Sequence, residues 1–204
     1  MKVSRKQAAE NRAAIVDAAE RLFRERGFEG VSIPEITKAA GLTHGGFYKS
    51  FGSKNALAAE ACEKSFEHAN EWLASAKSAS GGRGGGLAEY FTNYLSTRHR
   101  DDSRGGCPMA AFATDVHRQC DGVQETFSLG VDRYLANLED NLSSQSDVST
   151  PVQEEAIAAL TMIVGAMALS RATKGSNKRL SDRILRQTKL NLEKLNCGAV
   201  SARG

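Results

Sequence analysis

The sequence constrains the fold most strongly over residues 32–54, where helix-start signals and glycines alternate at short intervals. Ser32 and Glu35 stand three residues apart, which is the pattern of a capping box at the start of a helix. Gly41 follows where this helix would end, and Thr43 is placed to cap a second, shorter helix. The stretch therefore predicts two helices joined by a tight glycine turn, which is the helix-turn-helix layout.

Two adjacent glycines and two adjacent aromatic residues occupy the short second helix, in the run HGGFYKSF. Glycine costs a helix about 1 kcal/mol relative to alanine, so a pair of them needs a reason. Leu42, Phe47 and Phe51 are spaced to anchor this helix on its neighbours. Gly45 and Gly46 fall one turn earlier, at the exposed end that would enter a DNA groove, where a missing side chain lets the backbone approach closely.

The rest of the chain predicts an all-α protein. Only three prolines occur, and runs that alternate apolar and polar residues are scarce, so strands are not indicated. The 204 residues suffice for a three-helix head, predicted for residues 1–53, and a larger helical domain, predicted for residues 54–204. Helices are expected at 5–26, 33–40, 44–50, 54–77 and 87–100, from 108 to 120, and at 123–143, 151–173 and 181–196.

Charge is spread unevenly along the chain, although the net charge is only +3. Residues 1–54 hold ten Lys or Arg against six Asp or Glu, which is +4, so the remainder carries −1. A positive N-terminal region is typical of a protein that binds nucleic acid or another anionic surface. An ordinary solvated face is the alternative.

The sequence gives no sign of a secreted, membrane-bound or metal-binding protein. Four cysteines (Cys62, Cys107, Cys120 and Cys197) show neither zinc-site nor disulfide-framework spacing. The N-terminus lacks a signal core, and no run is expected to reach the about 20 apolar residues that span a bilayer. We therefore expect a cytoplasmic protein without a membrane partner.

Chemistry of other kinds is not indicated either. His117 and Cys120 have a spacing that can chelate a metal on one helix, but no second pair accompanies them. Nucleotide-binding and hydrolase motifs are missing from the sequence. No metal, cofactor or enzymatic activity is predicted.

Residues 12–57 resemble the DNA-binding domain of the TetR family of bacterial repressors. The chain matches the family pattern, or substitutes conservatively, at Ile36, Ala40, Gly41, Leu42, Thr43, Tyr48, Phe51 and Lys54. Thr37 replaces a usual alanine. Ser50 replaces a usual histidine, so any contact made by that histidine is in doubt. The resemblance implies a regulator whose larger domain binds a small molecule.

The resemblance also implies where DNA is contacted. Hydroxyl groups of Thr43 and Tyr48 can donate to phosphates, and His44 can donate to a base acceptor. Arg5 and Lys6 would form a basic arm for the minor groove. For His44 and Lys49 the alternative is plain solvent exposure. For Tyr48 it is a core position with a solvated hydroxyl. The candidate DNA-binding residues are Arg5, Lys6, Ser32, Thr43, His44, Gly45, Tyr48, Lys49 and Lys54.

The effector pocket of this family lies among the helices of the larger domain. Aromatic and methionine side chains from several predicted helices could line it, although an aromatic residue at helical spacing is more often part of a plain core. The candidate ligand-binding residues are Trp72, Phe91, Tyr94, Met109, Phe112, His117, Phe127, Tyr134 and Met162. His99 is a further polar candidate.

Cys107 raises a separate possibility. It directly precedes Pro108 near a predicted helix start, and Arg100 and Arg104 are close in sequence, all of which favours a thiolate. The residue is interpreted either as a sensor thiol for oxidants or electrophiles, or as an inert buried side chain.

The helices at 151–173 and 181–196 resemble the dimer interface of the family, a four-helix bundle formed with a second subunit. Gly165 and several alanines of the first helix would let another helix approach closely. Packing within the chain is the alternative. The predicted function is a homodimeric repressor of a palindromic operator, released by a small apolar or aromatic effector. The alternatives are a redox-sensing repressor acting through Cys107, and a helical enzyme or small-molecule carrier with a vestigial head.

Overall fold

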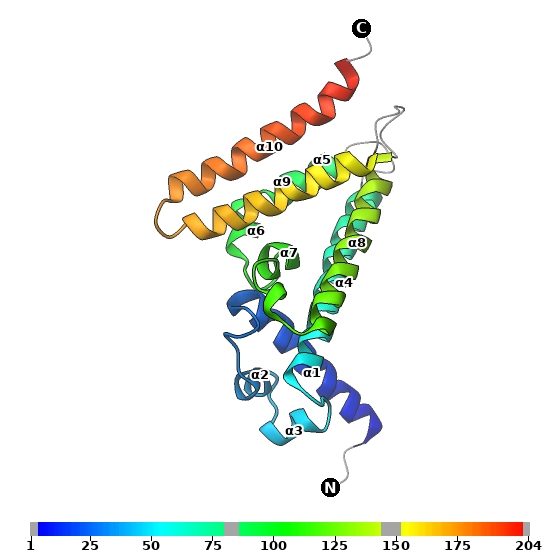
Figure 1. Cartoon of the computed structure of the whole chain (residues 1–204), viewed down its shortest axis with the longest axis vertical. Helices are drawn as coiled ribbons and strands as arrows, with labels where there is room; N and C mark the ends of the chain where they lie inside the picture. The colour runs from blue at the N-terminus through cyan, green and yellow to red at the C-terminus, as the bar shows by residue number, and fades with distance from the viewer. Residues whose placement is uncertain (1–3, 80–85, 144–151, 202–204) are drawn as a thin grey trace. The chain divides into compact units, whose positions relative to one another are not determined.

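The computed structural model describes residues 4–79, 86–143 and 152–201, and the regular structure of these residues is helical throughout (Figure 1). The all-α fold class is confirmed. The helices are α1 (Arg5–Arg26), α2 (Ile33–Ala39), α3 (His44–Tyr48), α4 (Lys54–Ala79), α5 (Gly86–Tyr94), α6 (Thr97–Asp101), α7 (Pro108–Phe112), a 3₁₀ turn η1 (Val116–Arg118), α8 (Asp121–Ser143), α9 (Val152–Thr173) and α10 (Lys178–Ser201).

The chain forms two compact units that alternate along the sequence. The first unit comprises Met1–Glu67 and Ser103–Gly130, and the second comprises His68–Asp102 and Val131–Gly204. The helices α4 and α8 each contribute residues to both units. This division differs from the sequence-based boundary at residue 53, because the start of α4 and a later segment pack with the N-terminal helices.

Contacts at the end of α1 explain why the later segment belongs to the first unit. The rings of Phe28 and Phe112 pack with their centroids 4.8 Å apart. The backbone N–H of Phe28 donates to the carboxylate of Asp115 at 2.9 Å, and the buried guanidinium of Arg24 donates to the carbonyl of Gly106 at 3.2 Å. The α1–α2 connection therefore relies on residues far along the chain.

The structure corrects the helix predicted for residues 87–100. It is interrupted after Tyr94, and a new helix, α6, begins at Thr97. The hydroxyl of Ser96 accepts a hydrogen bond from the His99 N–H at 3.1 Å, so the serine acts as an N-cap directly after the apolar pattern. Serine competes with helix continuation in this way because its side chain bonds to nearby backbone groups.

The helix predicted from residue 108 to 120 is also shorter than expected. It ends at Phe112, and the 3₁₀ turn Val116–Arg118 intervenes before α8 begins. His117 lies in this turn and Cys120 lies beyond it, both exposed, so they do not share a helix as their spacing suggested. In the described part of the chain, no three His, Cys, Asp or Glu residues gather as a metal site.

The apolar content of α9 exceeds the sequence-based expectation. By length and composition this helix could cross a membrane, with a mean hydropathy of 1.6 over its most apolar window. A core helix of a globular protein passes the same test. The residues of α9 that are buried within its unit include Ala156, Leu160 and Ile163, and burial of one side is the ordinary reason for such a composition.

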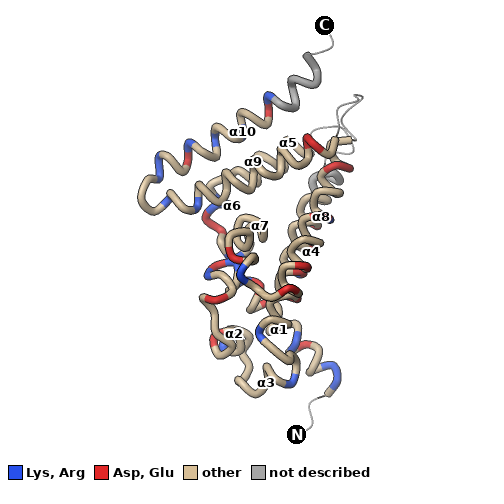
Figure 2. Tube along the Cα trace, in the orientation of Figure 1, with Lys and Arg blue, Asp and Glu red and all other residues tan. Residues whose placement is uncertain are grey.

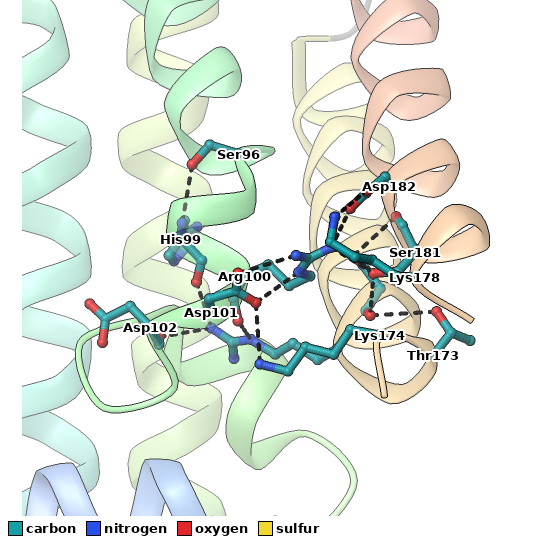
Figure 3. A network of polar contacts seen from close by, with 12 residues as sticks. Ser96, His99, Arg100, Asp101, Asp102, Thr173, Lys174, Lys178, Ser181 and Asp182 are labelled. Atoms are coloured by element: carbon teal, nitrogen blue, oxygen red, sulfur yellow. Dashed lines mark hydrogen bonds and ion pairs between the residues drawn. The ribbon is translucent and has the colours of Figure 1, made fainter. Parts of the chain in front are cut away.

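A polar network joins α6 to α9 and α10 in the second unit (Figure 3). The guanidinium of Arg100, only 3% exposed, donates to Asp182 at 2.6 Å and to Ser181 at 2.9 Å. Arg171 of α9 donates to the backbone carbonyls of residues 99, 100 and 102 at 3.2–3.3 Å. These carbonyls would otherwise lack partners at the end of α6. A helix of five residues is unstable alone, so the network holds it in place.

The same network lowers the pKa values of two carboxyl groups. Hydrogen bonds from Arg100 and then Lys174 hold the pKa of Asp101 at about 2, below its ordinary value of 3.8. Hydrogen bonds from Lys178 and Arg100 lower the pKa of Asp182 in the same direction. Each carboxylate therefore stabilises the folded chain above the pKa of the unfolded group, and loses this effect as the pH falls through the folded value.

We expect the double variant Asp101→Asn, Asp182→Asn to be less stable than the wild type at pH 6, by a small amount because both carboxyl groups are partly exposed. Between pH 5 and pH 2.5 the wild type should lose more stability than the variant, so the two should converge. Urea unfolding followed by circular dichroism at several pH values measures this. Asp132→Asn, at an exposed position of α8, is the control and should keep the wild-type slope. Parallel pH profiles for the wild type and the double variant would contradict the assignment.

Candidate nucleic-acid interface

The start of α2 is fixed by a reciprocal contact between Ser32 and Glu35. The carboxylate of Glu35 accepts from the Ser32 backbone N–H at 2.8 Å and from its hydroxyl at 2.7 Å. These bonds, together with Arg26, lower the pKa of Glu35 to about 2. The capping box predicted from the sequence is therefore formed. Because the Ser32 hydroxyl is engaged by Glu35, it would have to exchange partners to bind a phosphate.

The turn between α2 and α3 depends on Gly41. This glycine has φ = +71°, a left-handed conformation that residues with a Cβ rarely adopt. The turn is closed by the Leu42 N–H, which donates to the carbonyl of Thr37 at 2.8 Å. Thr43 then occupies the N-cap position of α3 without a side-chain capping hydrogen bond. Its exposed hydroxyl is therefore available to an external acceptor.

Two phenylalanines anchor α3. Phe47 is completely buried, Phe51 is nearly so, and their rings stack with centroids 5.7 Å apart. The carbonyl of Phe47 accepts from the backbone N–H groups of Ser50 and Phe51 at 2.8 and 2.9 Å, which ends the helix. One side of this five-residue helix is thus held by the interior of the first unit, and the other side is left to the solvent.

The outward side of α3 carries the residues expected to read DNA. Thr43, His44, Gly45, Tyr48 and Lys49 are all exposed. Tyr48 is 60% exposed, which excludes the alternative of a core position, and its ring meets that of His44 edge-on at 5.3 Å. Hydrogen-bonding side chains are thereby gathered on one exposed surface of a short helix.

The other candidate DNA-binding residues lie on different helices of the first unit. Arg5 and Lys6 form the first turn of α1, after the cap Ser4, so they extend the helix and do not form a separate arm (Figure 2). Lys54 is the first residue of α4, and its ammonium lies 3.9 Å from the carboxylate of Glu29. Its positive charge is therefore partly neutralised by Glu29.

The glycines of α3 are not required by the fold. Neither Gly45 nor Gly46 has a positive φ. A Cβ at Gly45 would meet no atom within 4 Å, and a Cβ at Gly46 would meet only Leu42, at an ordinary 3.8 Å. Gly41, with its left-handed backbone, is the opposite case. A glycine inside a helix that no internal contact requires is consistent with close approach of an external molecule.

Comparison with known proteins identifies relatives of this helix-turn-helix. Residues 15–61 match the family described as bacterial regulatory proteins, tetR family. The chain is 40% identical over 68 residues to the HTH-type transcriptional regulator AcrR of Shigella flexneri, a match that spans 33% of this chain and about a third (32%) of that relative. It is 23% identical over 172 residues to the regulator LmrA of Bacillus subtilis, covering 84% and 92% of the two chains.

Solved structures with the same fold include a TetR-family transcriptional regulator from Cytophaga hutchinsonii, with a TM-score of 0.75, 23% identity, and coverage of 97% and 98% of the two chains. The reduced form of E. coli NemR is similar at a TM-score of 0.76 and 18% identity, over 90% and 96% of the chains. Residues 15–61 thus carry the DNA-binding domain of the TetR family of transcriptional regulators. The helices α2 and α3 form the helix-turn-helix of this domain, and the relatives that match it are transcriptional regulators.

The candidate ligand-binding residues fall in both units. The second unit holds Trp72, Phe91, Tyr94, Tyr134 and Met162, and the first unit holds the four others. Of those four, Phe112 packs on Phe28 and Phe127 packs on Phe66, with ring centroids 4.8 and 5.4 Å apart. Met109 is buried and His117 is exposed. The two phenylalanine contacts are those of a packed core.

Three aromatic side chains of the second unit gather around Trp72, and a fourth, Tyr134, joins them through Tyr90. The Trp72 ring lies 4.7 Å from Tyr90, 6.0 Å from Tyr94 and 5.1 Å from His99, measured between centroids. The hydroxyl groups of Tyr90 and Tyr134 hydrogen-bond to each other. Tyr90 is not among the candidates predicted from the sequence, although its position four residues before Tyr94 places both on one helix face.

His99 is the polar member of this cluster. Its Nδ1 lies 2.8 Å from the carbonyl oxygen of Tyr94. Burial lowers the pKa of His99, a shift that the Tyr94 hydrogen bond only partly offsets, so the ring is neutral at neutral pH. With Nδ1–H donating to that carbonyl, Nε2 is left as an acceptor. The cluster thus combines flat apolar surfaces with hydroxyl and imidazole groups.

The open space around Gly45 of α3 predicts the effect of a substitution there on stability and on DNA affinity. Gly45→Ala should stabilise the folded chain by about 0.5–1 kcal/mol, because alanine favours the helix and its Cβ has open space. The same methyl group would crowd the DNA, so affinity for the selected operator should fall by on the order of tenfold. Thermal unfolding and fluorescence anisotropy measure the two effects.

Gly122→Ala is the matched control. Gly122 is also the second residue of a helix, and a Cβ there would likewise meet nothing within 4 Å. It lies in α8, away from the helix-turn-helix in sequence, so this variant should gain stability and keep its DNA affinity. If Gly45→Ala bound DNA as tightly as the wild type, the α3 backbone would not be the surface that approaches DNA.

Proposed function

We propose that this chain is a ligand-responsive transcriptional repressor that binds a palindromic operator as a homodimer. The observation that carries the proposal is the division of α3 into an anchored side, built on Phe47 and Phe51, and an exposed side with His44, Gly45 and Tyr48. Such a surface is suited to a DNA major groove. A repressor acts on the chromosome, so a cytoplasmic location belongs to the same proposal.

The proposal of a dimer rests on the size of α3 and on the surface of α9. A recognition helix of five residues buries too little surface to select one site in a genome, whereas two such helices can read both halves of a palindrome. The helix α9 exposes Ile157 and Leu169, at 51% and 58%, with Gly165 between them. A Cβ on Gly165 would meet no atom within 4 Å, which is the condition for a second helix to approach closely.

Release by an effector follows from two-state coupling. The aromatic cluster of Trp72, Tyr90, Tyr94, Tyr134 and His99 suits a small aromatic molecule with a few hydrogen-bonding groups. An effector that binds the DNA-free conformation more tightly lowers DNA affinity, and DNA lowers effector affinity by the same factor. Trp72 is the only tryptophan of the chain, so its fluorescence reports binding at the cluster directly.

Selection of DNA from a random library tests the proposal as a whole. The full chain should enrich a palindrome whose half-sites are spaced by about one or more helical turns. Affinity should fall steeply with salt, because several phosphates are neutralised. Binding that enriches no sequence would overturn the repressor and leave a carrier with a vestigial head. Small aromatic molecules that quench Trp72 should then release the selected DNA.

The α9 surface predicts how the dimer can be dissociated. Ile157→Glu combined with Leu169→Glu should convert a dimer into a monomer at micromolar concentration, because charges would be placed on a surface that must be desolvated. Analytical ultracentrifugation measures the state. Leu129→Glu, on α8 and also 51% exposed in the wild type, is the matched control and should remain dimeric. A dimer that survives the α9 double variant would rule this surface out.

A second candidate, thiol-based release through Cys107, is favoured by the position of this residue. Cys107 follows Gly106, whose carbonyl binds Arg24 of α1, and it directly precedes α7. A bulky adduct on this buried thiol would disturb the segment that packs on the end of α1. Cys62 is a contrasting buried thiol, because burial and then Glu63 raise its pKa to about 12.

The Cys107 candidate predicts that an electrophile such as N-ethylmaleimide releases DNA from the wild type and not from Cys107→Ser. Mass spectrometry identifies the modified cysteine, and anisotropy measures the bound DNA. Cys120→Ser, which removes an exposed thiol, is the control and should respond like the wild type. If Cys107→Ser still responded, or if Cys107 reacted more slowly than free cysteine, this candidate would be excluded.

A further inference from the structure

Arg12 lies at the centre of a chain of contacts that joins three helices of the first unit. Its guanidinium, on α1, binds both carboxylate oxygens of Glu60 on α4, the longer bond being 2.5 Å. The same guanidinium lies over the ring of Phe51, 4.6 Å from its centroid. Phe51 in turn stacks on Phe47 of α3. Each step is a direct contact, so the start of α4 is linked to the recognition helix through one arginine.

The two contacts of Arg12 depend on each other. A bidentate bond to a carboxylate fixes the plane of a guanidinium as well as its position. Attraction to an aromatic ring requires the cation to stay over the ring face. Among the described residues, Glu60 is the only acidic side chain that pairs with Arg12. Loss of Glu60 would therefore leave the arginine, which is 45% exposed, to solvent and uncover the face of Phe51.

A second ion pair favours one axial alignment of α4 on α1. Asp17 of α1 pairs with Lys64 of α4, about one turn further along both helices than the first pair. The charges are reversed between the two pairs, because α1 contributes the basic Arg12 to the first pair and the acidic Asp17 to the second. A slip of α4 by one turn would bring Lys64 toward Arg12, which is repulsive. The two pairs thus favour a single axial position of α4 on α1.

The end of α3 is sensitive to the position of Phe51. The N–H groups of Ser50 and Phe51 both donate to the carbonyl of Phe47. A displacement of the Phe51 ring therefore reaches α3 through the stacked rings and through these two hydrogen bonds. His44 and Tyr48, on the opposite side of the same short helix, would move with it.

We propose that Arg12 is a positioning residue for DNA recognition. Held by Glu60, it presses Phe51 onto Phe47 and fixes the orientation of the α3 surface that meets DNA. The contact is near the protein surface, where ion pairs are weak, so a modest displacement of the start of α4 is enough to release it. The competing explanation is that Arg12 itself binds a DNA phosphate.

Removal of Glu60 separates these explanations. In Glu60→Gln the full chain should show faster amide hydrogen exchange at Ser50 and Phe51, by about two- to fivefold, and weaker binding of the selected operator by a similar factor. A phosphate-binding Arg12 would instead bind DNA as tightly or more tightly once its carboxylate partner is gone. Lys178→Met is the control, because it breaks a surface pair with Asp182 in the second unit and should change neither readout.

A charge reversal tests the role of the ring contact. The variant Arg12→Glu, Glu60→Arg can restore an ion pair between α1 and α4, but a carboxylate over Phe51 cannot replace the cation. We expect thermal stability close to that of the wild type, with exchange at Ser50 and Phe51 still fast and operator binding still weak. Full recovery of both would overturn the proposal.

Each outcome of the exchange experiment is decisive by itself. Unchanged exchange at Ser50 and Phe51 in Glu60→Gln would overturn the positioning role, whatever the effect on DNA. The exchange readout needs no operator, so it also decides the proposal if the wild type proves to bind DNA without selectivity. In that case the repressor function would fail separately.

Discussion

The burial of Phe47 and Phe51 is the interaction on which the proposed DNA-binding surface depends. A helix of five residues does not form alone in water, because nucleation fixes several dihedral angles for very few hydrogen bonds. Here the two stacked rings supply the missing stability, and the left-handed Gly41 sets the direction in which the chain enters the helix. Because the inward side carries the stability, the outward side can carry hydrogen-bonding groups and a glycine that weaken a helix.

Much of the head could be predicted from the sequence because its determinants are local. The capping box of Ser32 and Glu35, the turn at Gly41 and the spacing of Phe47 and Phe51 all lie within twenty residues of each other. The extent of the first unit could not be predicted in this way. It depends on hydrogen bonds that Arg24 and Phe28 make with residues about eighty positions later, and no local pattern marks such partners.

The candidate DNA-binding and ligand-binding residues also differ in how far local sequence could predict them. The exposed place of Gly45 followed from its position one turn before the anchors, whereas His44 and Tyr48 were placed there by the family resemblance, with a core position left open for the tyrosine. The effector candidates could not be separated by periodicity, because an aromatic residue at helical spacing looks alike in a core and in a pocket. Phe112 and Phe127 pack on phenylalanines of the first unit, whereas Trp72 gathers Tyr90, Tyr94 and His99 around it in the second. The break at Ser96 was missed because no glycine or proline marks it.

The separation of the two sides of α3 also bears on how such a regulator diverges after gene duplication. A substitution at His44 alters a hydrogen-bonding group that does not contact the stacked rings of Phe47 and Phe51, whereas the ring of Tyr48 meets that of Phe47 edge-on at 5.1 Å. Under the proposed function, a duplicated copy can therefore drift toward a different DNA sequence through substitutions at His44 while the anchor of α3 is kept. Phe47 and Phe51 lack this freedom, because their buried rings are that anchor.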